Sequence, residues 1–218
     1  MRPVPDLRIY LVTDAGQCRR RGRTVTDTVR DAVEGGATCV QVRDKHADGA
    51  EFLSQVVDVA RTVGEVVPVI VNDRIDVFLA ARRLGAPVAG VHVGQSDLPA
   101  AVVRDLIGDD AYLGLSAATA EELIAAQEQG ACDHVGIGAV RATATKTDAP
   151  AGLGVGGIAQ LAASTALPCV AIGGVGAADL PALRAGGLSG AAVVSAICLA
   201  DDPRAAARAL RRAWEEGR

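Results

Sequence analysis

Aromatic residues are scarce in this chain, and it has no excess of positive charge. Phe, Tyr and Trp together make up only 2% of its 218 residues, which leaves few rings on which nucleic-acid bases could stack. The formal net charge is −4 at pH 7, so the chain also lacks the basic excess that a phosphate backbone attracts. The composition therefore predicts no nucleic-acid partner.

Targeting and redox motifs are missing as well. The N-terminal Met-Arg-Pro-Val-Pro-Asp has no signal-peptide-like apolar run, and no stretch reaches the length of a transmembrane helix. The five cysteines are odd in number and widely spaced, without a CxxC pair, so we expect reduced thiols: Cys18, Cys39, Cys132, Cys169 and Cys198. These features predict a cytoplasmic protein with no membrane partner.

Lysine is the scarcest charged residue, because only Lys45 and Lys146 accompany twenty arginines. An ammonium group is a compact point charge and a guanidinium group is a planar fork, so a site shaped for one does not automatically accept the other. Both lysines lie in short polar motifs that follow predicted strands. We expect them to contact a substrate phosphate, although a lone lysine is more often a solvated surface charge.

A regular alternation of apolar runs and amphipathic segments fills the rest of the chain. The apolar runs predict eight strands: Arg8–Val12, Thr38–Val42, Pro68–Val71, Ala89–Val93, Ala111–Leu115, His134–Ile137, Pro168–Ile172 and Ala191–Val194. The amphipathic segments predict the helices Thr24–Glu34, Glu51–Val63, Ile75–Leu84, Ala100–Leu106, Ala120–Gln129, Ile158–Ser164, Leu180–Ala185 and Pro203–Trp214.

This alternation favours an α/β fold, a single-domain (β/α)8 TIM barrel over residues 1–218. Almost wholly apolar strands suit a parallel sheet that is buried on both faces. A doubly wound open sheet is the structural alternative, but Thr13–Gln17 after the first strand lacks its glycine-rich fingerprint.

In such a barrel the active site forms at the C-terminal ends of the strands, so the polar residues there are the candidates. After the second strand, alternation places Gln41, Arg43 and Lys45 on one side. Further candidates follow the later strands: Asn72 and Asp73, Gly94 to Asp97, Ser116, Thr143 to Lys146, Gly173-Gly174, and Val194-Ser195. The last two pairs stand where barrels commonly bind phosphate. The sequence thus predicts two anion sites on one rim.

Asp73 and Asp97 are the candidates for a Mg²⁺ site. Mg²⁺ takes one or two protein carboxylates together with phosphate oxygens and waters. Either aspartate could instead cap the helix that follows it. The cations Arg43, Lys45 and Lys146 would repel one another without an anion, which favours a metal–diphosphate ligand. His46, His92 and His134 have no partners in sequence, and we expect His92 to be a core histidine.

Several motifs in a fixed order resemble the thiamine-phosphate synthase family. They are Tyr10-Leu-Val-Thr-Asp14, Gln41-Val-Arg-Asp-Lys45, Asn72-Asp73, Gly90-Val-His-Val-Gly-Gln95 with Asp97, Gly114-Leu-Ser116, Thr143-Ala-Thr-Lys146, Ile172-Gly-Gly-Val175 and Val194-Ser-Ala-Ile197. The chain departs from the family where Ala139 and Ala142 replace frequent prolines and where Arg141 replaces an aromatic residue or histidine.

The resemblance implies a transferase that joins 4-amino-2-methyl-5-(diphosphooxymethyl)pyrimidine to a thiazole phosphate, with pyrophosphate leaving first. It implies that the pyrimidine diphosphate is held by Gln41, Val42, Arg43, Asp44, Lys45, Asn72, Ser116 and Lys146. Of these, Arg43, Lys45, Ser116 and Lys146 would be catalytic. The thiazole phosphate would be held by Thr143, Ala144, Thr145, Gly173, Gly174, Val194 and Ser195, and Mg²⁺ by Asp73 and Asp97.

The partners implied are phosphorylated small molecules, and a homo-oligomer is compatible with the sequence. Two alternatives stay open at this stage. One is a thiazole phosphate tautomerase of the same fold, which needs proton transfer and no metal. The other is a non-catalytic barrel that binds a phosphorylated ligand.

Overall fold

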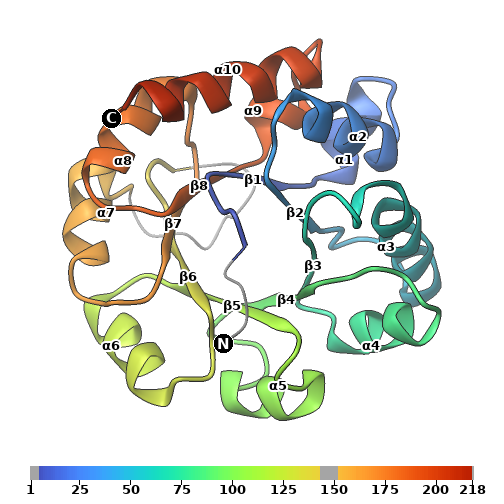
Figure 1. Cartoon of the computed structure of the whole chain (residues 1–218), viewed down its shortest axis with the longest axis horizontal. Helices are drawn as coiled ribbons and strands as arrows, with labels where there is room; N and C mark the ends of the chain where they lie inside the picture. Colours follow the sequence, from blue (N-terminus) through green and yellow to red (C-terminus); the bar gives the residue numbers. More distant parts are fainter. Residues whose placement is uncertain (1–4, 143–151, 218) are drawn as a thin grey trace.

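Eight short parallel strands close into a barrel in the computed structural model of this chain, which describes residues 5–142 and 152–217 (Figure 1). Each strand pairs with the next in sequence, and β8 pairs with β1. The strands are β1 (Ile9–Val12), β2 (Cys39–Val42), β3 (Val69–Asn72), β4 (Gly90–Val93), β5 (Tyr112–Ala117), β6 (His134–Gly138), β7 (Cys169–Ile172) and β8 (Gly190–Val193). The predicted (β/α)8 TIM barrel is confirmed.

Helices surround the barrel and connect its strands (Figure 1). They are α1 (Ala15–Arg20), α2 (Val25–Gly35), α3 (Gly49–Val63), α4 (Ile75–Arg83), α5 (Ala100–Ile107), α6 (Ala120–Gln129), α7 (Gly154–Ala162), the 3₁₀ helix η1 (Ala177–Asp179), α8 (Leu180–Ala185), α9 (Ser195–Cys198) and α10 (Pro203–Glu216). None of the helices in the described part of the chain is long and apolar enough to span a membrane.

The helix predictions need correction at one boundary and at three short elements. The predicted helix Ile158–Ser164 begins earlier, at Gly154, because the glycines of its first turn carry no apolar periodicity. The short helices α1 and α9 and the turn η1 were not predicted. Each has at most six residues, too few to show a 3.6-residue period.

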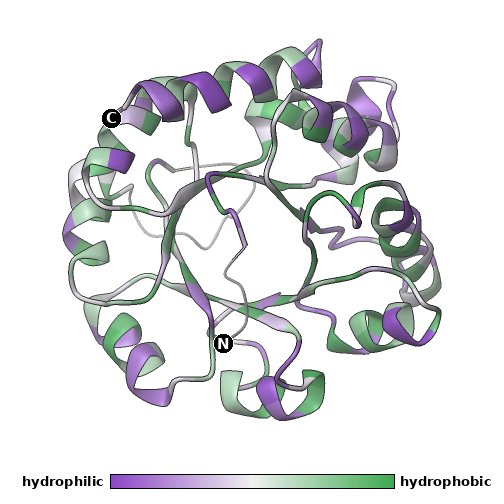
Figure 2. Cartoon of the chain, viewed as in Figure 1, coloured by the Kyte–Doolittle hydropathy of each residue, from purple (hydrophilic) through white to green (hydrophobic). Residues whose placement is uncertain are grey.

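The barrel register separates two apolar layers. Tyr10 lies opposite Cys39 and faces the interior, where it belongs to a small cluster with Leu7 and Ile70. The next residue, Leu11, faces outward into a much larger cluster between strands and helices. Figure 2 accordingly shows largely hydrophobic strands and helices of mixed character. Both faces of the sheet are therefore buried, as the near-continuous apolar runs predicted.

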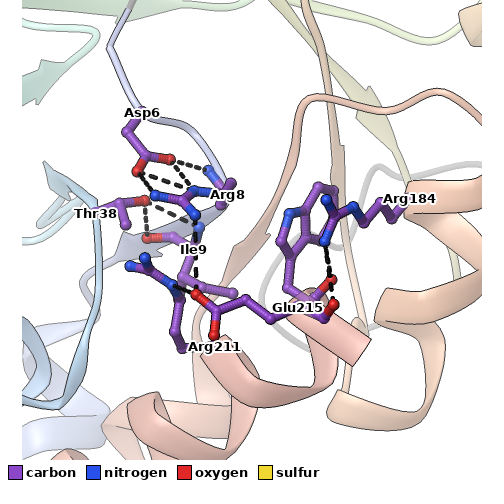
Figure 3. Close-up of polar contacts among 8 residues, drawn as sticks. Asp6, Arg8, Ile9, Thr38, Arg184, Arg211 and Glu215 are labelled. Carbon is purple, nitrogen blue, oxygen red and sulfur yellow. Dashed lines mark hydrogen bonds and ion pairs between the residues drawn. The ribbon is translucent and has the colours of Figure 1, made fainter. Parts of the chain in front are cut away.

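Polar contacts join the last helix to the start of the barrel (Figure 3). Arg8 makes a paired contact with Asp6 and lies 3.9 Å from a carboxylate oxygen of Glu215 in α10. Nε of Arg211 donates to the same Glu215 oxygen at 2.6 Å, and Arg184 donates to the carbonyl of Trp214 at 2.7 Å. These contacts lie at the N-terminal ends of the strands, opposite the candidate site.

Candidate active site

The segment after β2 places its side chains at different depths. Gln41 is buried, and its Nε2 donates to the hydroxyl oxygen of Tyr10 at 3.0 Å inside the barrel. Arg43 is half-buried, and its backbone N–H donates to Oγ1 of Thr13 at 2.9 Å. Lys45 is exposed. The two cations therefore stand nearer the barrel mouth than Gln41, whose amide belongs to the polar layer below them.

Asp44, between the two cations, organises the loop. Its Oδ1 accepts from the backbone N–H of His46 at 3.0 Å and of Ala47 at 3.3 Å. Such a local turn fixes the backbone directly after Lys45. The neighbouring Val42 is buried in the layer between barrel and helices.

Asp73 occupies an unusual backbone conformation just past β3. Its φ is +58°, in the left-handed region. Aspartate is one of the few residues other than glycine that adopt this conformation. Its N–H donates to the carbonyl of His92 at 2.9 Å, and Arg74 N–H donates to the carbonyl of Asn72 at 2.6 Å. This turn ends the strand and holds the half-buried carboxyl of Asp73 on the rim.

The loop after β4 brings Asp97 to the same place. Oδ2 of Asp97 accepts from the N–H of Gly94 at 2.7 Å, which closes the loop on itself. Nε2 of Gln95 donates to the carbonyl of Ser116 at 2.7 Å, which ties the loop to β5. Asp97 itself is exposed. The loop is thus fixed at both sides while its carboxylate stays accessible.

Neither aspartate is a helix cap. The N-cap of α4 is Arg74 and that of α5 is Pro99, and neither helix start has a side-chain cap hydrogen bond. The helix-cap alternative is therefore wrong for Asp73 and Asp97. Their position on the rim needs another explanation.

The pKa of the Asp73 carboxyl depends on Asp97 and on the two cations at the barrel mouth. Burial and the neighbouring charge of Asp97 raise the pKa of Asp73 to about 6, while Lys45 and Arg43 act to lower it. The half-buried carboxylate of Asp73 and the exposed one of Asp97 repel each other when both are ionised. A divalent cation between them would relieve that repulsion.

The donor set agrees with Mg²⁺ more than with a softer metal. Two carboxylates offer hard oxygen ligands, and Mg²⁺ usually completes its shell with phosphate oxygens and waters. Within the described ranges, no group of three or more His, Cys, Asp or Glu residues could hold a metal by itself. Asp73 and Asp97 could supply two of the oxygen ligands of such an ion.

Ser116 lies inside β5 rather than after it, because this strand runs to Ala117. Asn72 likewise is the last residue of β3. The Ser116 hydroxyl lies 3.0 Å from Nε2 of His92 in β4. The predicted site residues on β2 to β5 are therefore gathered along one arc of the barrel mouth.

A second polar region forms where β6, β7 and β8 end. Gly173 and Gly174 both have positive φ, at +92° and +70°, and a Cβ on Gly173 would lie 2.6 Å from that of Ala139. These two positions therefore need glycine. Val194 and Ser195 follow β8, and Ser195 is exposed. Val194 lies just beyond the strand predicted to contain it.

Arg141 connects the loops of this second region. It donates to both carboxylate oxygens of Asp179, at 2.7 Å and 2.6 Å, and to the carbonyl of Gly174 at 2.9 Å. Asp179 is buried and also accepts from Gly176 N–H at 2.9 Å. The arginine that departs from the family pattern thus braces the glycine turn after β7.

Four predicted residues, Thr143, Ala144, Thr145 and Lys146, lie outside the described residues. Sequence reasoning placed Gln95 among the rim candidates without a specific contact, did not single out Asp179, and treated His92 as a core residue. Only the alternation of His92 with Val91 and Val93 hinted at an inward side chain. Which inward groups meet across strands depends on the register.

Comparisons with known proteins agree on one family. Residues 9–197 match the family described as thiamine monophosphate synthase. Thiamine-phosphate synthase of Corynebacterium efficiens is 44% identical over 100% of both chains, and that of Vibrio parahaemolyticus is 46% identical over 93% of this chain and 96% of its own. The solved thiamine phosphate pyrophosphorylase from Pyrococcus furiosus superposes with a TM-score of 0.84 at 33% identity and covers 98% of each chain.

Proposed function

The chain belongs to the thiamine monophosphate synthase family, and we propose that it joins a pyrimidine methyl diphosphate to a thiazole phosphate in a Mg²⁺-dependent reaction. The products would be thiamine phosphate and pyrophosphate. One observation carries this proposal: Asp73 and Asp97 lie beside each other on the rim, with Arg43 and Lys45 acting on the same carboxyl. A metal-bound diphosphate satisfies both signs of charge at once.

The arc from β2 to β5 is the proposed diphosphate side. Arg43 and Lys45 would bind its oxygens, the amide of Asn72 and the hydroxyl of Ser116 would donate to it, and Asp73 and Asp97 would hold Mg²⁺. When bound, Mg²⁺ would neutralise charge that develops on the leaving pyrophosphate. Gln41, which donates to Tyr10 below the mouth, would line the floor under the pyrimidine. Val42 and Asp44 would act through the backbone of the same segment.

The opposite arc is the proposed thiazole phosphate side. Gly173 and Gly174 have no side chain to block a phosphate from their backbone, and Val194 and Ser195 follow the next strand. Barrels often bind phosphate after these two strands. Thr143, Ala144, Thr145 and Lys146 would complete the proposed site from the segment between β6 and α7. The two phosphorylated groups would then face each other across one mouth.

The proposed chemistry consists mainly of leaving-group stabilisation. Departure of pyrophosphate leaves a cationic pyrimidine methylene, which the thiazole nitrogen captures. Arg43, Lys45, Lys146 and Ser116 would all donate to pyrophosphate oxygens whose negative charge grows as the bond breaks. Interactions that strengthen in the transition state are those that raise kcat. This reaction requires no protein nucleophile.

The direct test is to incubate the protein with both substrates and Mg²⁺ and to measure thiamine phosphate. We expect product with Mg²⁺ and none with excess chelator. Asp97→Asn should weaken Mg²⁺–pyrophosphate binding in calorimetry and lower turnover about 10-fold or more. Asp105→Asn, which removes an exposed carboxylate from α5, is the matched control and should behave as wild type.

Two results would contradict the proposal. One is turnover that continues in chelator. The other is isomerisation of the thiazole phosphate without coupling, which would indicate a tautomerase. A cytoplasmic location and a homo-oligomeric state remain predictions.

A further inference from the structure

His92 lies inside the barrel mouth, where it contacts the proposed diphosphate side from below. Its imidazole is half-buried, and Nε2 lies 3.0 Å from Oγ of Ser116. The two residues are on adjacent strands, with His92 paired to Gly114 and Ser116 one inward-facing position further along β5. The ring therefore reaches diagonally toward the mouth of the barrel.

Two glycines make room for this ring. A Cβ on Gly114 would lie 2.3 Å from Nδ1 of His92, and a Cβ on Gly136 would lie 3.4 Å from its Cε1. The first distance excludes any side chain at Gly114, whereas the second is an ordinary contact. The sequence thus leaves an empty position on β5 that the histidine fills, and this packing restricts the orientation of the ring.

Aromatic rings support the imidazole from the far side. The ring of His134, which is fully buried, has its centroid 5.3 Å from that of His92, and it stacks on Tyr112 at 5.2 Å with an interplanar angle of 15°. A ring held between packed neighbours keeps its side-chain torsions fixed. His92 can therefore hold a hydrogen-bond partner in one geometry.

The direction of the hydrogen bond follows from the proposed ligand, on which this inference rests. A hydroxyl has one proton, and a diphosphate offers only acceptors. If Ser116 donates to the diphosphate, it has no proton left for His92. Nε2 of His92 must then carry the proton and donate it to Oγ.

We propose that His92 is a positioning residue: its Nε2–H donates to Oγ of Ser116 and turns the serine proton toward the substrate diphosphate. It touches no substrate in this arrangement. Gln95, which holds the carbonyl of Ser116 at 2.7 Å, fixes the backbone of the same residue. The serine is thus oriented through its side chain and its main chain by two residues of the β4 segment.

A double-mutant cycle tests the proposal. Ser116→Ala should lower kcat/KM for the pyrimidine diphosphate by about 10- to 150-fold, the range for a hydrogen bond to a charged group. His92→Phe should lower it by at least about 10-fold, but by less than about 2-fold when Ser116 is already alanine. His92→Gln, whose amide nitrogen can donate, should recover part of the loss. KM for the thiazole phosphate should stay unchanged.

Ser189→Ala removes an exposed hydroxyl at the opposite end of the barrel and is the matched control, with wild-type kinetics expected. Additive losses in the double variant, or wild-type kinetics in His92→Phe, would show that His92 does not act through Ser116. If His92→Phe fails to fold, the cycle is run with His92→Gln against Ser116→Ala, with the same criterion of additivity.

A second measurement needs no variant. In ¹⁵N-histidine-labelled protein with Mg²⁺ and pyrophosphate, long-range ¹H–¹⁵N spectra should show the Nε2–H tautomer of His92, and an Nδ1–H tautomer would overturn the proposal. The two proposals fail separately. A wild-type protein that makes no thiamine phosphate contradicts the proposed function, whereas an active wild type with additive variants contradicts only the role of His92.

Discussion

Single residues set the electrostatics of the rim, and Asp73 is the clearest case. Its burial and the neighbouring charge of Asp97 make ionisation of this carboxyl unfavourable and raise its pKa. Proteins concentrate such groups at functional sites because a ligand can relieve the cost. At Asp73 the relieving ligand would be a cation.

The raised pKa of Asp73 predicts how stability depends on pH. The ordinary pKa of its carboxyl is 3.8, and burial raises this pKa to about 6. The folded state therefore binds the carboxyl proton more tightly than the unfolded state does. The contribution of the protonated Asp73 carboxyl to folding stability is present below about pH 4 and is lost as pH rises through 6. Asp73→Asn, which tolerates the same φ, should therefore be about 1–2 kcal/mol more stable than wild type at pH 7 and equal to it at pH 4.

Urea unfolding from pH 4 to 7.5 would measure this difference. Asp105→Asn serves again as the control and should run parallel to wild type. A constant gap between Asp73→Asn and wild type across this range would show that the carboxyl is not perturbed.

Gly114 is the second residue whose identity the packing dictates. Gly114→Ala would place a Cβ 2.2 Å from Cε1 of His134 and 2.3 Å from Nδ1 of His92. Overpacking of this kind costs about 1–3 kcal/mol. We expect a lower melting temperature and reduced turnover for Gly114→Ala. Gly136→Ala, which faces the same imidazole at 3.4 Å, should change both much less. Equal effects of the two substitutions would contradict this account.

At the scale of elements, loops at the strand ends are held by side chains from neighbouring connections. Gln95 holds the loop after β4 against β5, and Arg141 holds the segment after β6 against the turn after β7. The brace at Arg141 includes the buried carboxylate of Asp179, whose pKa is lowered by the guanidinium hydrogen bond. Loops fixed in this way can present their backbone to a ligand without first being ordered.

Arg141→Ala should weaken thiazole phosphate binding through Gly174. Loss of the brace frees the carbonyl of Gly174 and leaves Asp179 without its cation, so KM for the thiazole phosphate should rise roughly 3- to 10-fold. KM for the pyrimidine diphosphate should be unaffected, and Arg208→Ala, which replaces an exposed arginine on α10, is the control.

Arg141→Ala should also unfold more easily than wild type at neutral pH. That difference should shrink as pH falls below about 4, where the lowered pKa of Asp179 no longer stabilises the fold.

At the scale of the whole molecule, folding buries the cysteine side chains. All five cysteines are free thiols and all are buried. Contacts between α10 and the start of β1 hold the two ends of the described chain together (Figure 3). A reagent in solution can therefore reach these thiols only when the protein opens locally or globally.

The cysteines allow a test of this burial. A reductant should change neither turnover nor melting temperature, because the thiols are already reduced. A thiol reagent such as an aromatic disulfide should label native protein only as fast as the protein opens, and should label five thiols rapidly in denaturant. Labelling should slow further when Mg²⁺ and pyrophosphate stabilise the fold. Immediate labelling of native protein, or a fall in melting temperature with reductant, would show an exposed thiol or a disulfide.

The sequence by itself determined the barrel. Local periodicity and apolar runs placed all eight strands within about two residues, because strands buried on both faces consist of little else. It also singled out the polar residues that follow those strands, from Arg43 and Lys45 to Ser195. These residues are local in sequence, so their position at the strand ends needs no knowledge of distant contacts.

Only the tertiary structure decided what these residues do to one another. Asp73 and Asp97 could each have been a helix cap until the barrel placed their carboxyls side by side. His92 was indistinguishable from a core histidine until the register set it opposite Gly114 and within 3.0 Å of Ser116. Arg141 became a brace only when the fold brought the segment after β7, with Gly174 and Asp179, next to it. Pairings between strands depend on closure of the whole sheet, and local propensity does not encode which side chains then meet.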